Sequence, residues 1–329
     1  MSRWTISRVI NGHPGVKAET RKRVLEAMGE AGFFPNAMAR GLRGSKTHLV
    51  GVCFQELESP ILARKTSILQ HHLRLNGYRA ILELTDGNGS LETEVVRHFL
   101  AMQVDGIVLV GSTLQPDDAL IHGLQEVACP TVLVDPVNDL PFSKICLARE
   151  WAMRLIFDHL CGMGHRRFGF LGIDDVVPYG TDRLNGALRE ARRYNLSPRR
   201  DFVTLSIPSE RPQDYNYGWK LANRLQGLEK QPTALIALND RVAIGALKNL
   251  VDRGFKIPGD YSVIGFDNLE VTAYTNPPLT TIDQQVEVMI STAVNVLMQE
   301  IASETEGKPE NRIIRPIMFE RESTGAANA

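Results

Sequence analysis

The spacing of apolar positions predicts helices at the start of the chain. In residues 2–11, Ile6, Val9 and Ile10 recur three and four positions apart, which is typical of a short amphipathic helix. Residues 13–15, His-Pro-Gly, end this helix because proline and glycine both interrupt helical structure. A second helix is predicted from about Lys17 to Ala31. The residues expected on its buried face are Val24, Leu25 and Met28.

After the second helix the pattern changes. Residues 36–44 form a stretch too short to be a stable helix alone, and Gly44–Lys46 is typical of a hinge. From Leu49 onward, short apolar runs alternate with amphipathic helical stretches. The predicted strands are Leu49–Phe54, Arg79–Leu84, Gly106–Val110, Thr131–Val134, Arg167–Leu171, Ala234–Ala237 and Ser262–Phe266. Continuous apolar strands separated by helices predict parallel sheets covered on both faces, and their number favours two lobes.

Charge is divided unevenly along the 329 residues. The whole chain carries a net charge of −1, but residues 1–46 hold nine basic and only three acidic side chains, a net of +6. A basic segment joined to an acidic remainder favours contact with a polyanion at that end. Charge alone leaves a solvated helix face as an equal alternative.

Several features of the sequence indicate the cellular compartment of the protein. The chain opens Met1-Ser2-Arg3-Trp4 with no apolar core of a secretory signal behind it, and no run is long enough to span a bilayer. The four cysteines lie in apolar stretches without metal-ligand spacing, so buried reduced thiols are expected at Cys53, Cys129, Cys146 and Cys161. A cytoplasmic protein with no membrane partner, no metal and no cofactor is therefore expected.

The first helix also carries chemistry suited to DNA. Thr5, Ser7, Arg8 and Asn11 add hydroxyl, guanidinium and amide groups to it. Short polar groups bind phosphate oxygens, and arginine binds guanine in the major groove. An ordinary amphipathic surface helix remains an equal alternative on these residues alone.

Read together, three motifs near the N-terminus resemble the LacI-type repressors. They are Ser2–Gly12 (SRWTISRVING), Val16–Arg21 (VKAETR) and Phe34–Leu42 (FPNAMARGL). Further landmarks of that family recur in order along the chain. These are Gly164–Arg167, Arg183–Gly186, Asn239-Asp240 with Ala243 and Gly245, Ile257–Asp260, Gly265–Asn268, Pro277–Ile282 and Arg321–Thr324.

The resemblance implies an α/β protein with a truncated all-α helix-turn-helix and a hinge helix ahead of a two-lobed sensor. The sensor would be of the type I, periplasmic-binding-protein-like kind, built of doubly wound parallel sheets, and the protein a homodimer. The DNA-binding segment is expected at 1–46 and the effector-binding and dimerisation domain at 47–329. Crossovers near Leu147, Thr281 and Ile314 would divide that domain into lobe 1, about 47–147 with 282–314, and lobe 2, about 148–281 with 315–329.

By the same resemblance, individual residues receive roles in reading a pseudo-palindromic operator. Arg3, Trp4 and Arg8 would face base edges, while Thr5, Ser7 and Asn11 would hold the backbone. The hinge-helix positions implied are Asn36, Ala39, Leu42 and Arg43. Leu42 would insert between base pairs of the minor groove and kink the duplex.

An effector site is expected between the lobes, at the carboxyl ends of the strands. Asp267 ends an apolar strand, where a carboxylate without a partner would be costly. The resemblance places Asp267, Asn239 and Arg183 in the site, although a helix cap, a turn or a salt bridge is an alternative role for each.

Three departures from the family pattern affect the ligand. Ser59-Pro60-Ile61-Leu62 stands where the family has an aromatic loop, and Ala148-Arg149 where many members have an Asp-Asn pair. Gln213 lies near the position at which the family often has an aromatic that stacks on the ligand. Ser59, Arg149 and Gln213 therefore join the candidate effector residues. The loss of two aromatic platforms and the gain of an arginine favour a sugar acid or sugar phosphate over a plain neutral hexose.

Other functions fit less well. Gly169–Gly172 lacks the spacing of a dinucleotide loop, and no P-loop or nucleophile elbow is present, so an enzyme is not expected. A transport receptor of the same fold would need a signal peptide. A sensor without competent operator binding remains the main alternative to an effector-controlled DNA-binding repressor.

The start of the chain supports the alternative of a sensor without competent operator binding. A helix-turn-helix requires a first helix ahead of the recognition helix, whereas here the recognition helix begins at Ser2 or Arg3. Met1 stands where related repressors have valine, and a GTG valine codon can also start translation in bacteria. We therefore expect the annotated start to lie inside the gene and the chain as given to bind operator poorly.

Overall fold

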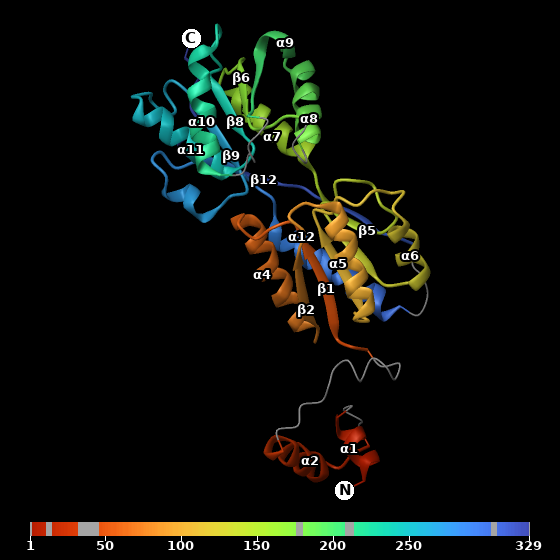
Figure 1. Ribbon diagram of the computed structural model, residues 1–329. Helices are drawn as coiled ribbons and strands as arrows, with labels where there is room; N and C mark the ends of the chain where they lie inside the picture. The colour runs from red at the N-terminus through yellow and green to blue at the C-terminus, as the bar shows by residue number, and fades with distance from the viewer. Residues whose placement is uncertain are drawn as a thin grey trace.

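The computed structural model describes residues 2–10, 15–31, 46–175, 180–207, 214–303 and 308–328. At the N-terminal end, α1 (Arg3–Ile10) packs against α2 (Ala18–Glu30), and Val9 and Val24 are buried there (Figure 1). The prediction that Leu25 is buried is wrong, because its side chain is 54% exposed. One step along a helix turns a side chain by about 100°, which carries Leu25 away from the face of Val24. The predicted hinge helix at 36–44 lies outside the described residues.

The first sheet is entirely parallel and has the strand order β11-β5-β4-β3-β1-β2. Its strands are β1 (Leu49–Phe54), β2 (Arg79–Leu84), β3 (Gly106–Val110), β4 (Thr131–Val134), β5 (Ser143–Leu147) and β11 (Asn311–Ile314). The helices α5 (Gly89–Ala101) and α6 (Ala119–Val127) cover one face, and α4 (Pro60–Leu75) and α12 (Val286–Ala302) cover the other. Because successive strand residues point to opposite faces, Ile107 packs with α5 and α6 while Val108 packs with α4 and α12.

The second sheet has the order β12-β10-β9-β8-β6-β7, parallel except where β12 pairs antiparallel with β10. Its strands are β6 (Phe168–Leu171), β7 (Phe202–Leu205), β8 (Ala234–Ala237), β9 (Ser262–Phe266), β10 (Thr280–Asp283) and β12 (Ile317–Phe319). Its helices are α7 (Arg149–Gly162), α8 (Gly180–Arg193), α9 (Pro198–Asp201), α10 (Tyr215–Arg224) and α11 (Asp240–Asp252), with 3₁₀ turns η1 (Leu225–Gly227) and η2 (Glu270–Tyr274). The two sheets with their helices form two separate α/β lobes (Figure 1).

The chain passes between the two sheets three times. It leaves the first sheet after β5, returns after β10, and leaves again between β11 and β12. The second crossover was expected near Thr281, which lies inside β10 of the second sheet, and the chain leaves that strand at Gln284. Arg149 and Gln284 therefore stand at two of the three connections.

The cysteines are free thiols in two environments. Cys53 and Cys161 are buried as expected, whereas Cys129 and Cys146 are partly exposed. Burial raises the pKa of the thiol in all four, to about 12 for Cys53 and Cys129 and about 11 for Cys161. The neutral thiol is therefore the stable form at neutral pH.

Candidate functional site

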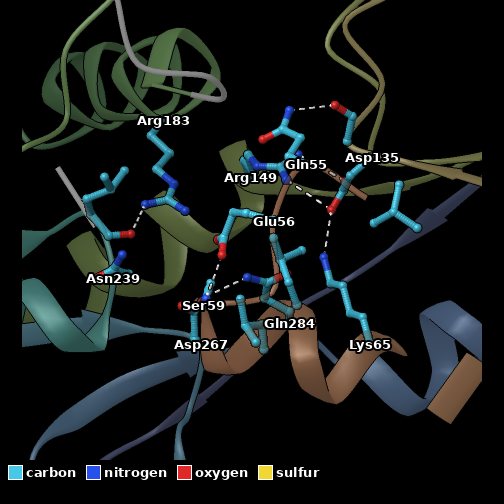
Figure 2. Close-up of a pocket in the computed structure, with 15 residues that line it drawn as sticks. Gln55, Glu56, Ser59, Lys65, Asp135, Arg149, Arg183, Asn239, Asp267 and Gln284 are labelled. Carbon is cyan, nitrogen blue, oxygen red and sulfur yellow. Dashed lines mark hydrogen bonds and ion pairs between the residues drawn. The ribbon is translucent and has the colours of Figure 1, made fainter. Parts of the chain in front are cut away.

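A cavity lies between the lobes, where the carboxyl ends of several parallel strands face one another (Figure 2). It encloses ≈ 840 Å³ of empty space, part of it open to solvent. The lining residues are Gln55, Glu56, Ser59, Ile61, Leu62, Lys65, Val110, Gly111, Asp135, Arg149, Arg183, Leu238, Asn239, Asp267 and Gln284. They come from both lobes and from the two connections at Arg149 and Gln284, so a ligand here would contact both lobes and two of the three connections.

Asp135 forms a buried ionic cluster on one side of the cavity. Its Oδ1 accepts a hydrogen bond from the Leu147 N–H at 2.8 Å and from Arg149 Nη1 at 3.1 Å. Its Oδ2 lies 3.0 Å from Arg149 Nη2 and 3.5 Å from Lys65 Nζ. Burial alone would raise the pKa of Asp135, but Arg149, Lys65 and the hydrogen bonds outweigh it and hold that pKa below its ordinary value. Since Lys65 belongs to α4 and Arg149 begins α7, this carboxylate joins the two lobes.

Asp267 forms the opposite side, directly after β9. Its carboxylate accepts a hydrogen bond from Gln284 Nε2. Burial raises the pKa of Asp267 to about 6, and the Arg183 guanidinium and the Gln284 hydrogen bond limit that rise. The group is therefore ionised in most molecules at neutral pH.

A second carboxyl, that of Asp240, lies behind Asp267 and is fully buried. It accepts hydrogen bonds from Thr281 Oγ1 and from the Leu269 N–H. Burial and the nearby Asp267 carboxylate raise the pKa of Asp240 well above its ordinary value. Both effects disfavour the charged form of Asp240.

Arg183 reaches from α8 into the same region and is buried (Figure 2). Its Nη1 donates to the Leu238 carbonyl, and its guanidinium carbon lies 3.8 Å from the centre of the Phe266 ring. Burial and then the positive charge of Arg149 lower the pKa of Arg183 to about 9, which leaves the group protonated at neutral pH. Among the described residues its Nε has no hydrogen-bond acceptor.

Asn239 and Ser59 stand at helix starts that border the cavity. The Asn239 Oδ1 accepts the Val242 N–H at 2.9 Å and so caps α11. The Ser59 N–H donates to Glu56 Oε2 at 2.8 Å at the beginning of α4. Asn239 therefore caps a helix, which is the alternative role given for it above, and it also lines the cavity.

The structure brings five of the six predicted effector residues together in this cavity. They are Ser59, Arg149, Arg183, Asn239 and Asp267. The sixth, Gln213, lies outside the described residues. Sequence reasoning missed Lys65, Asp135 and Gln284.

Signals for two of the missed residues were present in the sequence. Asp135 follows the apolar run Thr131–Val134 just as Asp267 follows its own strand. Lys65 falls four positions after Ile61 and four before Leu69, so it interrupts the apolar face of a helix. Gln284 had no comparable local signal, because β10 was not recognised.

Of the predicted DNA-binding residues, Thr5 and Arg8 are described with their side chains. The Ser2 Oγ accepts the Thr5 N–H at 3.1 Å and lies 2.9 Å from Thr5 Oγ1, so Ser2 caps the start of α1. Arg8 is half-buried one turn further along. For Arg3, Trp4 and Ser7 only the helical backbone is described, and Asn11, Asn36, Ala39, Leu42 and Arg43 lie outside the described residues.

Among the helices in the described ranges, none combines the length and the apolar character needed to cross a membrane. Within those same ranges, no three histidine, cysteine, aspartate or glutamate side chains are grouped so that they could bind a metal ion.

Two family models match separate parts of the chain. Residues 1–36 match the model of bacterial regulatory proteins of the lacI family, and residues 157–324 match the periplasmic binding protein-like domain. The HTH-type transcriptional regulator reg1 of Streptomyces lividans is 31% identical over 334 residues, which cover 99% of this chain and 94% of that protein.

Solved structures agree with the whole arrangement. The lac repressor dimer bound to operator and the anti-inducer ONPF superposes with a TM-score of 0.85 at 24% identity, covering 99% of this chain and 96% of the repressor chain. A complex of the transcriptional regulator CelR with cellobiose superposes with a TM-score of 0.71 at 25% identity, covering 98% and 96% of the two chains.

Proposed function

Because the chain belongs to the LacI family of bacterial regulatory proteins, we propose that its N-terminal segment binds operator DNA and that a small carbohydrate-like effector in the cavity between the lobes controls this binding. In this proposal residues 1–46 are the DNA-binding segment and 47–329 the sensor. The protein acts as a cytoplasmic repressor, without catalysis and without a cofactor.

One observation carries the effector part of the proposal: the cavity is built from both lobes and from two of their connections. A ligand that contacts Asp267 and Arg183 of lobe 2 and Ser59 and Lys65 of lobe 1 binds one relative position of the lobes better than another. Such a difference in affinity is what a ligand needs in order to shift a conformational equilibrium. The cellobiose complex of CelR supports a carbohydrate as the ligand class.

The DNA part rests on the motifs of the basic N-terminal segment. We assign Arg3, Trp4 and Arg8 to base edges, Thr5, Ser7 and Asn11 to the backbone, and Asn36, Ala39, Leu42 and Arg43 to the minor groove next to the sensor. A pseudo-palindromic operator read by a homodimer is part of the same proposal.

A surface on lobe 2 supports the homodimer. Tyr215, Trp219 and Tyr274 are all exposed, and Tyr215 lines one surface groove with Trp219 and an adjoining one with Tyr274. Contiguous exposed aromatic side chains are typical of a protein interface. Trp219→Glu should therefore convert the dimer into a monomer in light scattering, with the circular dichroism spectrum unchanged.

Operator binding is tested by fluorescence anisotropy with DNA from upstream of the protein's own gene. We expect Arg8→Ala to weaken binding at least about tenfold, because an arginine contact to a base is worth roughly 1–3 kcal/mol. Arg97→Ala, an exposed arginine of α5, is the matched control and should change nothing. Equal affinities for Arg8→Ala and the parent would contradict the assignment.

Effector binding is tested separately by thermal shift with sugars, sugar acids and sugar phosphates. A ligand at about 100 times its dissociation constant adds roughly 2.7 kcal/mol to the folded state. Binding of such a ligand without any operator binding would favour the alternative, a sensor of this fold that does not act on DNA.

A further inference from the structure

Among the residues that the structure describes, the lining of the cavity between the lobes contains more buried positive than negative charge. Three buried cations line it, Lys65, Arg149 and Arg183, against two buried carboxylates, Asp135 and Asp267. The remaining carboxylate of the lining, Glu56, is only half-buried, so water screens its charge. Burial and the neighbouring Asp267 carboxylate raise the pKa of Asp240, so a negative charge is disfavoured at that residue.

The excess charge can be placed at particular residues. Lys65 and Arg149 both form an ion pair with the carboxylate of Asp135. Arg183 has no ion pair of its own within the described part of the chain, and its hydrogen bond goes to the carbonyl of Leu238. The charge of Arg149 also acts on Arg183, since it is one of the causes that lower the Arg183 pKa. Two guanidinium groups on neighbouring helices therefore repel each other at the wall of the cavity.

Two buried polar atoms at this wall also have unmet hydrogen-bonding capacity. They are Arg183 Nε, a donor, and Gln284 Oε1, an acceptor, and neither has a partner among the described residues. A buried polar group without a partner is costly, which points to a ligand that supplies one. The ligand must offer an acceptor to Arg183 and a hydroxyl donor to Gln284.

From this geometry we propose that the effector is an acidic polyol, whose carboxylate or phosphate group lies between Arg149 and Arg183 and whose hydroxyls bind Asp267 and Gln284. The inference rests on the proposed effector-sensing function and narrows its ligand class. A negative group between the two guanidiniums balances the buried charge and accepts the hydrogen bond of Arg183 Nε. A neutral sugar supplies hydroxyls for Asp267 and Gln284 but leaves the excess positive charge uncompensated.

The test uses the full chain and matched probes: D-glucose, D-glucuronate and D-glucose 6-phosphate, the corresponding galactose set, and inorganic phosphate against chloride at equal ionic strength. We expect charged probes, but not neutral sugars, to raise the melting temperature. A stronger effect of the uronates indicates a carboxylate ligand, and a stronger effect of the phosphates indicates a phosphate ligand.

Variants show where the anion binds. Arg149→Asn should raise the dissociation constant of the charged probes about tenfold or more, because loss of a hydrogen bond to a charged group weakens binding by roughly that factor. Arg149→Lys keeps the charge and should retain part of the affinity. Arg154→Gln, on the exposed side of the same helix α7, is the matched control and should bind as the parent does.

The inference is overturned if a neutral sugar stabilises the protein as much as its charged counterparts. It is also overturned if no charged probe stabilises the parent more than it stabilises Arg149→Asn. Operator binding measured on the same preparations separates this failure from failure of the proposed function, because a regulator with a neutral effector still binds its DNA.

Discussion

The carboxylate of Asp105 fastens Thr47 to the first lobe at the point where the sensor begins. Asp105 Oδ1 accepts the Thr47 N–H at 2.8 Å and lies 2.8 Å from Thr47 Oγ1, while Oδ2 accepts the His48 N–H at 2.8 Å. Asp105 immediately precedes β3, and Thr47 and His48 lead into β1, its neighbour in the sheet. The junction between the N-terminal segment and the sensor is therefore fixed to the centre of the first sheet.

Removal of the Asp105 carboxylate should lower the stability of the protein and loosen the junction between the N-terminal segment and the sensor. We expect Asp105→Ala to lower the free energy of unfolding by about 2–3 kcal/mol in a urea titration, because hydrogen bonds to a charged group are lost and the N–H groups lose their acceptor. Asp117→Ala, an exposed aspartate of the same lobe, serves as the control and should stay within about 0.5 kcal/mol of the parent. A loss no larger than that of the control would mean that the carboxylate does not hold the junction.

The Asp135 cluster should be sensitive to loss of its central carboxylate. Asp135→Asn removes the negative charge that both Lys65 and Arg149 contact, and we expect a loss of about 3–5 kcal/mol in unfolding free energy. The combined replacement of Lys65, Asp135 and Arg149 by Met, Leu and Met should recover most of this loss, since well-packed apolar residues replace a buried ion cluster at little cost.

The pH dependence of that variant follows from the lowered pKa of Asp135. A carboxyl whose pKa falls on folding stabilises the folded state above its unfolded value, near pH 4, and this contribution is lost as the pH falls further. The difference in stability between the parent and Asp135→Asn should therefore shrink below about pH 4. A difference that stays constant from pH 7 to pH 3 would show that the charge of Asp135 is not what matters.

Asp240 should show the opposite dependence. Its pKa is raised, so the folded state keeps a proton that the unfolded chain releases, and the stability it contributes is lost as the pH rises above about 4. Asp240→Asn mimics the protonated carboxyl, and Thr281 Oγ1 can reverse its hydrogen bond to accept from the new amide. Melting temperatures measured from pH 4 to pH 8 should therefore decline less in Asp240→Asn than in the parent. A parallel decline in both proteins would contradict a protonated Asp240.

The strand β10, which the sequence failed to predict, is buried by contacts with distant residues. The buried Thr280 of β10 receives its partners from more than forty positions away, with its N–H donating to Ser323 Oγ at 2.8 Å and its hydroxyl 3.1 Å from that of Thr324. The polar residues of β10 thus resemble a loop until the C-terminal segment covers them. By contrast, β3 and β8 are apolar throughout and were predicted with their correct bounds.

Some residues of the candidate site could likewise be predicted from the sequence and others could not. Asp267 could be predicted because a carboxylate after an apolar strand is unusual, and the resemblance added Arg183 and Asn239. Asp135 stands in the same position after β4 but was assigned no role, since its partners Lys65 and Arg149 come from helices about 70 and 14 residues away in the sequence. The charge balance in the cavity depends on residues from both lobes, so local sequence patterns do not predict it.

The contact between α10 and α11 depends on two glycines, one on each helix. A Cβ atom on Gly245 of α11 would lie 1.8 Å from the Tyr215 carbonyl oxygen, and one on Gly218 of α10 would lie 2.0 Å from the Val242 carbonyl oxygen. Because these obstacles are backbone atoms, the helices must separate to admit a methyl group, and we expect Gly245→Ala to cost about 3 kcal/mol or more in unfolding free energy. Gly123→Ala in α6, where nothing lies within 4 Å of the new Cβ, should instead be neutral or stabilising by up to about 1 kcal/mol.

Urea titrations of Gly245→Ala and Gly123→Ala test this prediction. If Gly245→Ala is as stable as Gly123→Ala, the close approach of α10 and α11 is not required. Since Tyr215 and Trp219 of α10 also form the proposed dimer surface, Gly245→Ala should further weaken self-association in light scattering, whereas Gly123→Ala should leave it unchanged.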